Sequence, residues 1–142
     1  MSDTYQLTGN CLCGSVRFTA KSVNPHVGAC HCSMCRHWGG GPLLAVGCGT
    51  AVTFENAEKI KVFDSSEWAE RGFCSECGSH LFYRLKQTQE HIMPAGLFED
   101  QEKFDFDHQV FIDNKPAYYD FANQTHDMTE AEVFAKYAPP AE

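Results

Sequence analysis

Short segments in which hydrophobic and polar residues alternate recur along the chain, separated by Gly, Asn and Asp. In one of them Val16, Phe18 and Ala20 alternate with Arg17 and Thr19, which is the period of a half-buried β-strand. Several segments are rich in β-branched and aromatic residues, which favour strands. The pattern therefore predicts a mainly β protein. The predicted strands are residues 5–8, 15–20, 43–46, 51–55, 59–63, 80–85, 91–95 and 109–112.

Two segments carry helix signals. Residues 129–132 read Thr-Glu-Ala-Glu, which is the form of a capping box, and Val133, Phe134 and Tyr137 follow on one side. This pattern predicts a short C-terminal helix. A shorter turn of helix is expected after Cys32, through residues 34–38.

Composition and charge narrow the class of protein. Of the 142 residues, 43% are hydrophobic, which suffices for a buried core without disulfide bonds. No linker or repeat interrupts the chain before residues 139–140, so residues 1–142 are predicted to form a single domain. The net charge is −8 and no Lys/Arg cluster occurs. Because an acidic chain repels phosphate backbones, we expect no nucleic-acid partner.

The expected location follows from the apolar stretches. Residues 1–10 are polar, so no signal peptide is predicted, and stretches such as residues 43–46 are too short to span a bilayer. We therefore expect a cytoplasmic protein with no membrane partner. In a reducing compartment disulfides are rare, and paired cysteines more often hold metal.

The outer cysteines form two pairs. Cys11 and Cys13 form a C-x-C pair, and Cys74 and Cys77 form a C-x-x-C pair followed by Gly78. Residues i and i+2 of an extended strand point to the same side, and a C-x-x-C turn curls around an ion. The four thiolates therefore predict a closed, tetrahedral structural zinc site. The same donors suit iron, and the alternatives without metal are a redox C-x-x-C motif or plain buried cysteines.

The middle cysteines, Cys30, Cys32 and Cys35, can hold one ion from a single loop. Three protein ligands leave one coordination position for water or substrate, as in a catalytic zinc site. Alternatively, Cys48 or His31 closes the site and makes it structural. His31 stands between two ligands, so its side chain is expected to point away, either as a nearby acid or base or as a hydrogen-bonding core residue. Cys48 is otherwise a small buried residue.

The thiolate-rich middle site favours one kind of chemistry. Three thiolates leave Zn²⁺ with a net charge of −1, so it acidifies a bound water less strongly than a site with three histidines. It remains a good partner for a soft sulfur ligand, and a thiol substrate would lose its proton on coordination. The site therefore indicates an enzyme that handles thiols or thiol adducts rather than a hydrolase.

The order C-x-C, C-H-C-x-x-C-R, C-x-x-C-G resembles the glutathione-dependent formaldehyde-activating enzyme family, which includes centromere protein V-like domains. Further blocks resemble those of the family, and the similarity covers about residues 7–121. These blocks, each given with the family pattern that it resembles, are residues 71–78 (R-x-F-C-x-x-C-G), 95–100 (A-G-x-L/F-x-D), 108–111 (H-I-x-x) and 115–118 (K-x-x-W, with Tyr118 where tryptophan is common).

The resemblance implies a β-tent fold of antiparallel sheets around two zinc ions. It matches Cys11, Cys13, Cys74 and Cys77 to a structural zinc and Cys30, Cys32 and Cys35 to a catalytic zinc. It also implies carbon–sulfur lyase activity, with formaldehyde and glutathione joined to give S-hydroxymethylglutathione.

Residues beside the ligand loop are candidates for a glutathione pocket. Arg36 can meet a carboxylate of glutathione, and Trp38 with the glycines at 39–41 can shape the pocket. A solvated arginine and a flexible turn are the alternatives for these residues. The interpretation as an enzyme has two alternatives. One is a non-catalytic, zinc-stabilised binding module, and the other is a thiol redox switch at the middle cysteines.

Overall fold

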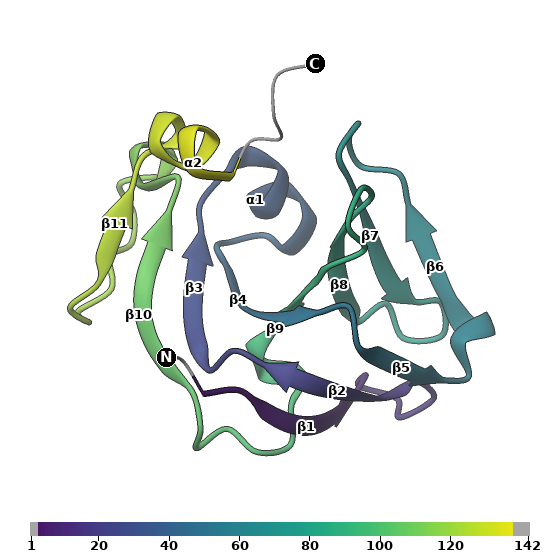
Figure 1. Cartoon of the computed structure of the whole chain (residues 1–142). Coiled ribbons are helices and arrows are strands. Elements are labelled where there is room, and N and C mark those ends of the chain that lie inside the picture. The colour runs from purple at the N-terminus through teal and green to yellow at the C-terminus, as the bar shows by residue number, and fades with distance from the viewer. Residues whose placement is uncertain (1–2, 138–142) are drawn as a thin grey trace. The chain divides into compact units, whose positions relative to one another are not determined.

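The computed structural model describes residues 3–137, and their contacts divide the chain into two compact units. The first unit contains residues 3–25 and 45–104, and the second contains residues 26–44 and 105–137. Figure 1 labels the strands and helices of both. The side chain of Tyr137 and residues 139–140 lie outside the described part. No helix of the described residues is long and apolar enough to cross a bilayer.

A three-stranded antiparallel sheet opens the first unit. It consists of β1 (Tyr5–Asn10), β2 (Arg17–Val23) and β5 (Val52–Glu55), with β2 in the middle. The alternation that predicted β2 is confirmed, because Phe18 and Ala20 are buried while Arg17 is exposed and Thr19 is half-buried. This sheet therefore turns one apolar face inward.

The other strands of the first unit also pair in antiparallel fashion. Their order is β4 (Leu43–Gly49), β9 (His91–Pro94), β8 (His80–Leu85), β7 (Ala69–Cys74) and β6 (Ile60–Phe63). The boundary between the two units falls within β4, after Leu44. Two short 3-10 helices, η1 (Ala57–Lys59) and η2 (Ala95–Leu97), connect strands.

Aromatic rings from both sheets meet in the core of the first unit. Phe18 of β2 lies edge-on to Phe98, with ring centroids 5.2 Å apart, and Phe54 of β5 lies 5.6 Å from Phe82 of β8. Phe82 is 1% exposed. Because burial of one such ring stabilises a fold by about 1.5–3 kcal/mol, this cluster holds the two sheets together.

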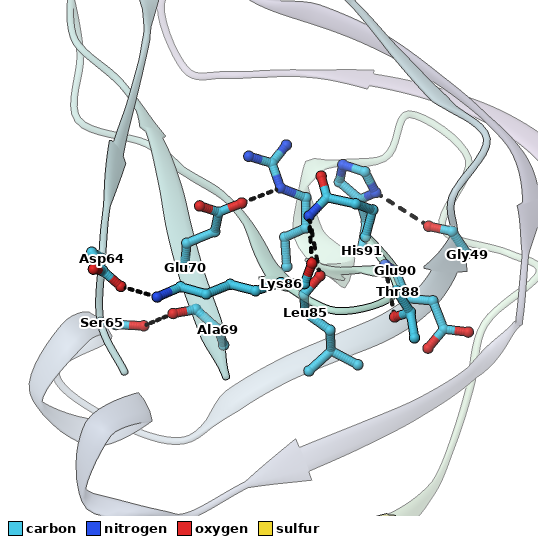
Figure 2. Close-up of polar contacts among 12 residues, drawn as sticks. Gly49, Asp64, Ser65, Ala69, Glu70, Leu85, Lys86, Thr88, Glu90 and His91 are labelled. Carbon is cyan, nitrogen blue, oxygen red and sulfur yellow. Dashed lines mark hydrogen bonds and ion pairs between the residues drawn. The ribbon is translucent and has the colours of Figure 1, made fainter. Parts of the chain in front are cut away.

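His91 of β9 is a histidine within this aromatic core. It is 6% exposed, and its ring lies 5.3 Å from that of Phe82. Its Nδ1–H donates to the carbonyl oxygen of Gly49 at 3.2 Å, as Figure 2 shows. Burial lowers the pKa of His91, and the hydrogen bond to Gly49 only partly opposes this effect. The imidazole is therefore neutral in the folded protein at pH 7.

Acid is expected to destabilise the protein partly through His91. The unfolded histidine takes up a proton below its ordinary pKa of about 6.5, whereas the folded one resists protonation until its lowered pKa is reached. Its contribution to stability is thus present above about pH 6.5 and is lost as the pH falls below that value. His91→Phe should reduce the loss by at most about 1.4 kcal/mol per pH unit. Urea unfolding at pH 7 and pH 5.5 measures this, and equal losses in both proteins would contradict it.

The second unit contains a parallel sheet. In it, β10 (Asp105–Val110) lies between β3 (His26–Cys30) and β11 (His126–Met128), and both pairings are parallel. The β3–β10 register shifts between Phe106 and His108, which leaves Asp107 as a bulge. The short helix α1 (Ser33–Gly39) follows β3 directly, and the 3-10 helix η3 (Ile112–Asn114) follows β10.

The C-terminal helix α2 (Glu130–Tyr137) begins at the predicted capping box. The Thr129 backbone N–H donates to Glu132 Oε1 at 2.8 Å, and the Glu132 N–H donates to Thr129 Oγ1 at 3.2 Å. Phe134 lies 5.8 Å from Phe111, ring centroid to ring centroid. The reciprocal bonds satisfy two backbone donors that the first turn of a helix leaves unpaired.

The predicted class is confirmed as mainly β with a C-terminal helix, and the predicted helical turn after Cys32 is α1. The predicted antiparallel pairing holds among the strands of the first unit, whereas β10 pairs in parallel with both of its neighbours. Parallel strands need a crossover connection, which the long chain segments before β10 and after it provide. Sequence patterning gave no indication of β3, β7 or β11.

Candidate metal centres

The structure gathers seven of the eight cysteines into two groups. All eight are free thiols. Cys11, Cys13, Cys74 and Cys77 form one group in the first unit, which we call the four-cysteine centre. Cys30, Cys32 and Cys35 form another in the second unit, the three-cysteine centre. Within each group all sulfurs lie within 4.8 Å of one another, so each can hold a metal ion.

The spacing of sulfurs in the four-cysteine centre fits a tetrahedral ion. The Sγ atoms of Cys11 and Cys13 lie 3.6 Å apart, and those of Cys13 and Cys74 lie 3.9 Å apart. Zn–S bonds of about 2.3 Å in a regular tetrahedron place neighbouring sulfurs about 3.8 Å apart, whereas a disulfide needs about 2.05 Å. The geometry and the donor type therefore suit Zn²⁺ held by four thiolates.

Two tight turns bring these sulfurs together. The Gly14 N–H donates to the carbonyl oxygen of Cys11 at 3.1 Å, and the Gly78 N–H donates to that of Cys74 at 2.8 Å. Gly78 has φ +80°, a left-handed conformation that glycine adopts without strain. Cys11 and Cys13 therefore meet through a turn after β1, rather than through the extended strand that the sequence suggested.

Hydrogen bonds favour the thiolate form at two of the four sulfurs of this centre. Hydrogen bonds with Ser79 lower the pKa of Cys77 to about 5, and hydrogen bonds with Ser15 lower the pKa of Cys13. Burial raises the pKa of Cys74 to about 11. The Leu12 N–H donates to Ser79 Oγ at 2.9 Å and so ties the two turns together. Because metal binds the thiolate, these contacts favour a metal-bound centre.

The three-cysteine centre is built where β3 becomes α1. Cys30 is the last residue of β3, Cys32 is the N-cap of α1, and Cys35 lies in its first turn. The Cys35 N–H donates to Cys32 Sγ at 3.4 Å, as expected of an N-cap. Helix curvature thus turns the sulfurs at the N-cap and at Cys35 to the same side.

The three sulfurs of this centre can be thiolates together only if a cation is bound between them. Hydrogen bonds to Cys32 and Cys35, followed by burial, raise the pKa of the Cys30 thiol far above its usual range. Three sulfurs this close cannot all be charged unless a cation balances them. Among the His, Cys, Asp and Glu of residues 3–137, no fourth side chain joins the group. The described residues therefore offer three sulfurs to an ion at this centre, one fewer than the four ligands of a closed tetrahedral site.

The two side chains considered for closing this centre are engaged elsewhere. Cys48 is buried in β4, where its thiol donates to the Val46 carbonyl oxygen at 3.7 Å, and burial raises its pKa to about 12. His31 is 0% exposed, and both ring nitrogens make hydrogen bonds of 2.7 Å, to Tyr119 and Gln109. Burial lowers the pKa of His31. His31 is therefore a neutral, hydrogen-bonded core residue rather than a ligand.

The predicted pocket residues lie on α1. Arg36 is half-buried, and its Nε–H donates to the carbonyl oxygen of His31 at 3.2 Å. Trp38 is half-buried one turn below Cys35. Both residues thus belong to the same short helix as two of the three sulfurs, and their part in substrate binding stays a prediction.

Sequence reasoning missed a third group of candidate ligands, His26, Asp105 and Asp107, in the second unit. Its residues are exposed or half-buried, and Asp107 accepts from His26 Nδ1 at 2.5 Å and from His108 Nδ1 at 2.8 Å. Partial burial acts to raise the pKa of Asp107, but the hydrogen bonds to His108 and His26 outweigh it and lower that pKa. The i, i+2 spacing of the two aspartates on one strand was the signal that could have indicated this group.

Comparison with known proteins gives consistent matches. Residues 6–114 match the family model described as glutathione-dependent formaldehyde-activating enzyme. An uncharacterized lyase of Schizosaccharomyces pombe is 38% identical over 126 residues, which cover 88% of this chain and 92% of that protein. A Sordaria macrospora protein that carries the name of the enzyme family is 35% identical over 78 residues, 52% of this chain but only 32% of that protein.

A solved structure shares the fold. The crystal structure of a Rhodobacter sphaeroides protein superimposes with a TM-score of 0.57 and covers 66% of this chain and 88% of that one. Its sequence identity is 22%, so this likeness concerns the fold alone.

Proposed function

The chain belongs to the glutathione-dependent formaldehyde-activating enzyme family, and from that premise we propose that it is a zinc-dependent carbon–sulfur lyase acting on adducts of glutathione or a similar thiol. The relative named a lyase, matched over almost its whole length, supports the reaction class. The observation that carries the proposal is the three-cysteine centre with no fourth protein donor among the described residues. We expect a small-molecule thiol as substrate, in the cytoplasm.

The four-cysteine and three-cysteine centres have different roles in this proposal. The four-cysteine centre uses all of its tetrahedral positions on protein sulfurs, so it serves the fold. At the three-cysteine centre, a bound zinc ion would supply one further position for a thiol sulfur and would lower the pKa of that thiol. The protein contributes the three thiolates, their spacing, and the short helix on which two of them lie.

The proposed reaction joins the thiol to an aldehyde. The sulfur of glutathione, as the thiolate, forms a bond to the carbonyl carbon of formaldehyde, and the π electrons of the C=O bond move to oxygen. That oxygen takes up a proton, which balances the proton lost by the thiol, and S-hydroxymethylglutathione results. The reverse sequence breaks the carbon–sulfur bond. Formaldehyde offers few atoms for contact, so recognition must come chiefly from the peptide part of the thiol.

Arg36 is the residue that we assign to that recognition. Its Nε–H is held by the carbonyl oxygen of His31, which fixes the guanidinium beside the ligand loop. The terminal nitrogens of an arginine so held can make paired hydrogen bonds with a carboxylate. Trp38 follows two residues later on α1 and offers an apolar wall. We propose that these two residues orient the peptide part of glutathione.

The direct test follows the exchange between formaldehyde, glutathione and their adduct by NMR, with the uncatalysed rate subtracted. We expect wild-type protein to accelerate the exchange and Cys32→Ser to abolish the acceleration. Serine keeps an N-cap oxygen for α1 but replaces a soft thiolate by a poor zinc ligand, so the helix is spared. Cys48→Ala, which removes a thiol outside both centres, should retain the activity. Equal rates with wild type and Cys32→Ser would exclude formaldehyde with glutathione as the substrates.

A further inference from the structure

His31 lies between two ligands of the three-cysteine centre, and all four of its polar groups are paired. Its backbone N–H donates to the Val110 carbonyl oxygen at 3.2 Å, and its own carbonyl oxygen accepts from Arg36 Nε at 3.2 Å. Its ring nitrogens bond to Tyr119 and Gln109. The position and the rotation of this residue are therefore fixed from both the backbone and the side chain.

The hydrogen bonds of the His31 ring extend through further side chains. Gln109 Nε2 bonds to Thr125 Oγ1 at 3.0 Å, and Thr125 Oγ1 bonds to Asp127 Oδ1 at 2.6 Å. With His31 and Tyr119, these residues form an unbroken series of four hydrogen bonds, which we call the polar chain. Gln109 is 6% exposed and lies in β10, and Asp127 lies in β11.

The Asp127 carboxylate at one end of the polar chain determines which group donates and which accepts in each of its hydrogen bonds. An ionised aspartate only accepts, so the hydroxyl of Thr125 donates to Asp127 and must itself accept from the Gln109 amide N–H. The Gln109 oxygen then faces His31 and accepts from its Nε2–H. In a neutral imidazole Nδ1 is left with a lone pair, which accepts from the hydroxyl of Tyr119. One tautomer of His31 is thus selected, and one orientation of its ring with it.

We propose that the polar chain positions the three-cysteine centre, with His31, Gln109, Thr125 and Tyr119 as positioning residues for its metal. A peptide unit on each side joins His31 to Cys30 and Cys32, so the hydrogen bonds that hold the His31 side chain also hold its backbone, and a displacement of that backbone moves both sulfurs. Side chains that hydrogen-bond to the ligands of a metal commonly change its affinity by about 10–100-fold, and the polar chain acts one residue away from two ligands, through the backbone that His31 shares with Cys30 and Cys32. Tyr119, Thr125 and Asp127 lie beyond the residues 6–114 that match the family model.

The inference deepens the proposed function, because it concerns the metal on which that function rests, but its test needs no substrate. Tyr119→Phe removes the hydroxyl that donates to His31 with little change of volume. Thr125→Val removes the hydroxyl that orients Gln109, and Thr125→Ser restores it. We expect the first two variants to bind Zn²⁺ at the three-cysteine centre about tenfold more weakly, measured by competition with a chelator. Thr125→Ser should bind as the wild type does.

The four-cysteine centre is an internal control for these measurements. Its ligands lie in the first unit, so its affinity should stay unchanged in every variant. With ¹¹³Cd²⁺ in place of zinc, only the NMR resonance of the three-thiolate site should shift. A purely structural role would lower the melting temperature and leave both resonances and both affinities in place. That result in Tyr119→Phe and Thr125→Val would overturn the inference.

The failure of this inference and the failure of the proposed function are distinguishable. If the variants bind metal as tightly as the wild type, the polar chain does not position the centre, but the proposed lyase reaction is unaffected. If the wild type catalyses no carbon–sulfur reaction while the variants bind zinc more weakly as predicted, the proposed reaction is wrong and the positioning role of the polar chain is supported. A wild-type protein that binds a single metal ion would overturn both.

Discussion

Cys74→Ala is expected to abolish soluble, folded protein. Cys74 is 0% exposed, and its sulfur belongs to a centre that joins residues 61 positions apart in sequence, Cys13 and Cys74. The variant would leave three closely spaced sulfurs, those of Cys11, Cys13 and Cys77, one ligand short of the tetrahedral ion that the four sulfurs fit. Structural zinc contributes about 10–16 kcal/mol in small zinc-binding peptides, which is comparable to or larger than the total stability of about 5–15 kcal/mol that most domains have.

Cys48→Ala is the matched control for Cys74→Ala. It makes the same chemical change at a position that is also 0% exposed, but outside both cysteine centres. The loss of one small buried group should cost about 1 kcal/mol and leave two metal ions per chain. The soluble fraction after expression, the thermal melting curve and the zinc content separate the two variants. Similar melting temperatures for both would contradict a structural role of the four-cysteine centre.

Cys32→Ser is expected to give a folded protein with one metal ion per chain instead of two. The ligand that it removes belongs to a centre with only three protein donors, and the serine oxygen can still accept the Cys35 N–H at the start of α1. The melting temperature should change by only a few degrees, in contrast to the collapse expected for Cys74→Ala. Lyase activity should be lost completely, because the remaining two thiolates cannot hold the ion in place.

Metal analysis and calorimetry of the same preparation check this second prediction. A mild chelator should remove one zinc from the wild type and make it resemble Cys32→Ser in stability and inactivity. The proposed division between a structural and a catalytic centre would be wrong if Cys32→Ser destabilised the protein as much as Cys74→Ala. It would also be wrong if the variant kept two tightly bound metal ions.

The sequence alone was sufficient for much of both cysteine centres. Metal-ligand spacing is a local property, because C-x-C and C-x-x-C place two sulfurs near each other in almost any turn. The grouping of Cys11 and Cys13 with Cys74 and Cys77 is confirmed by the structure, as is the separate group of Cys30, Cys32 and Cys35. The mainly β class followed equally from short alternating segments, and the helix α2 followed from its capping box.

Two of the three strands that escaped prediction, β3 and β7, contain glycines that tertiary contacts require. In β7, a Cβ on Gly72 would lie 2.3 Å from the ring of Phe82 in β8. In β3, a Cβ on Gly28 would lie 2.2 Å from Nε2 of His108 in β10. Glycine weakens a strand pattern, so a sequence window without knowledge of these neighbours does not predict a strand in either segment.

The polar chain could not be foreseen for a related reason. His31 and Gln109 are 78 residues apart, and His31 and Tyr119 are 88 apart, so only the pairing of β3 with β10 brings them together. That pairing is parallel, and hydrophobic periodicity carries no information about which strands become parallel neighbours. The sequence placed His31 beside the ligands and left its role open between a fourth ligand, a nearby acid or base and a core residue. The hydrogen bonds at both of its ring nitrogens identify it as a core residue.

The central claim is that the three-cysteine centre holds zinc through protein sulfur at three positions and keeps the fourth for a substrate thiol. Anomalous diffraction at the zinc edge, from zinc-loaded crystals grown with glutathione, tests it most directly. We predict one peak surrounded by Cys11, Cys13, Cys74 and Cys77, and a second bound by Cys30, Cys32, Cys35 and the sulfur of glutathione. A fourth protein atom bound to the second zinc, with glutathione excluded, would contradict the account.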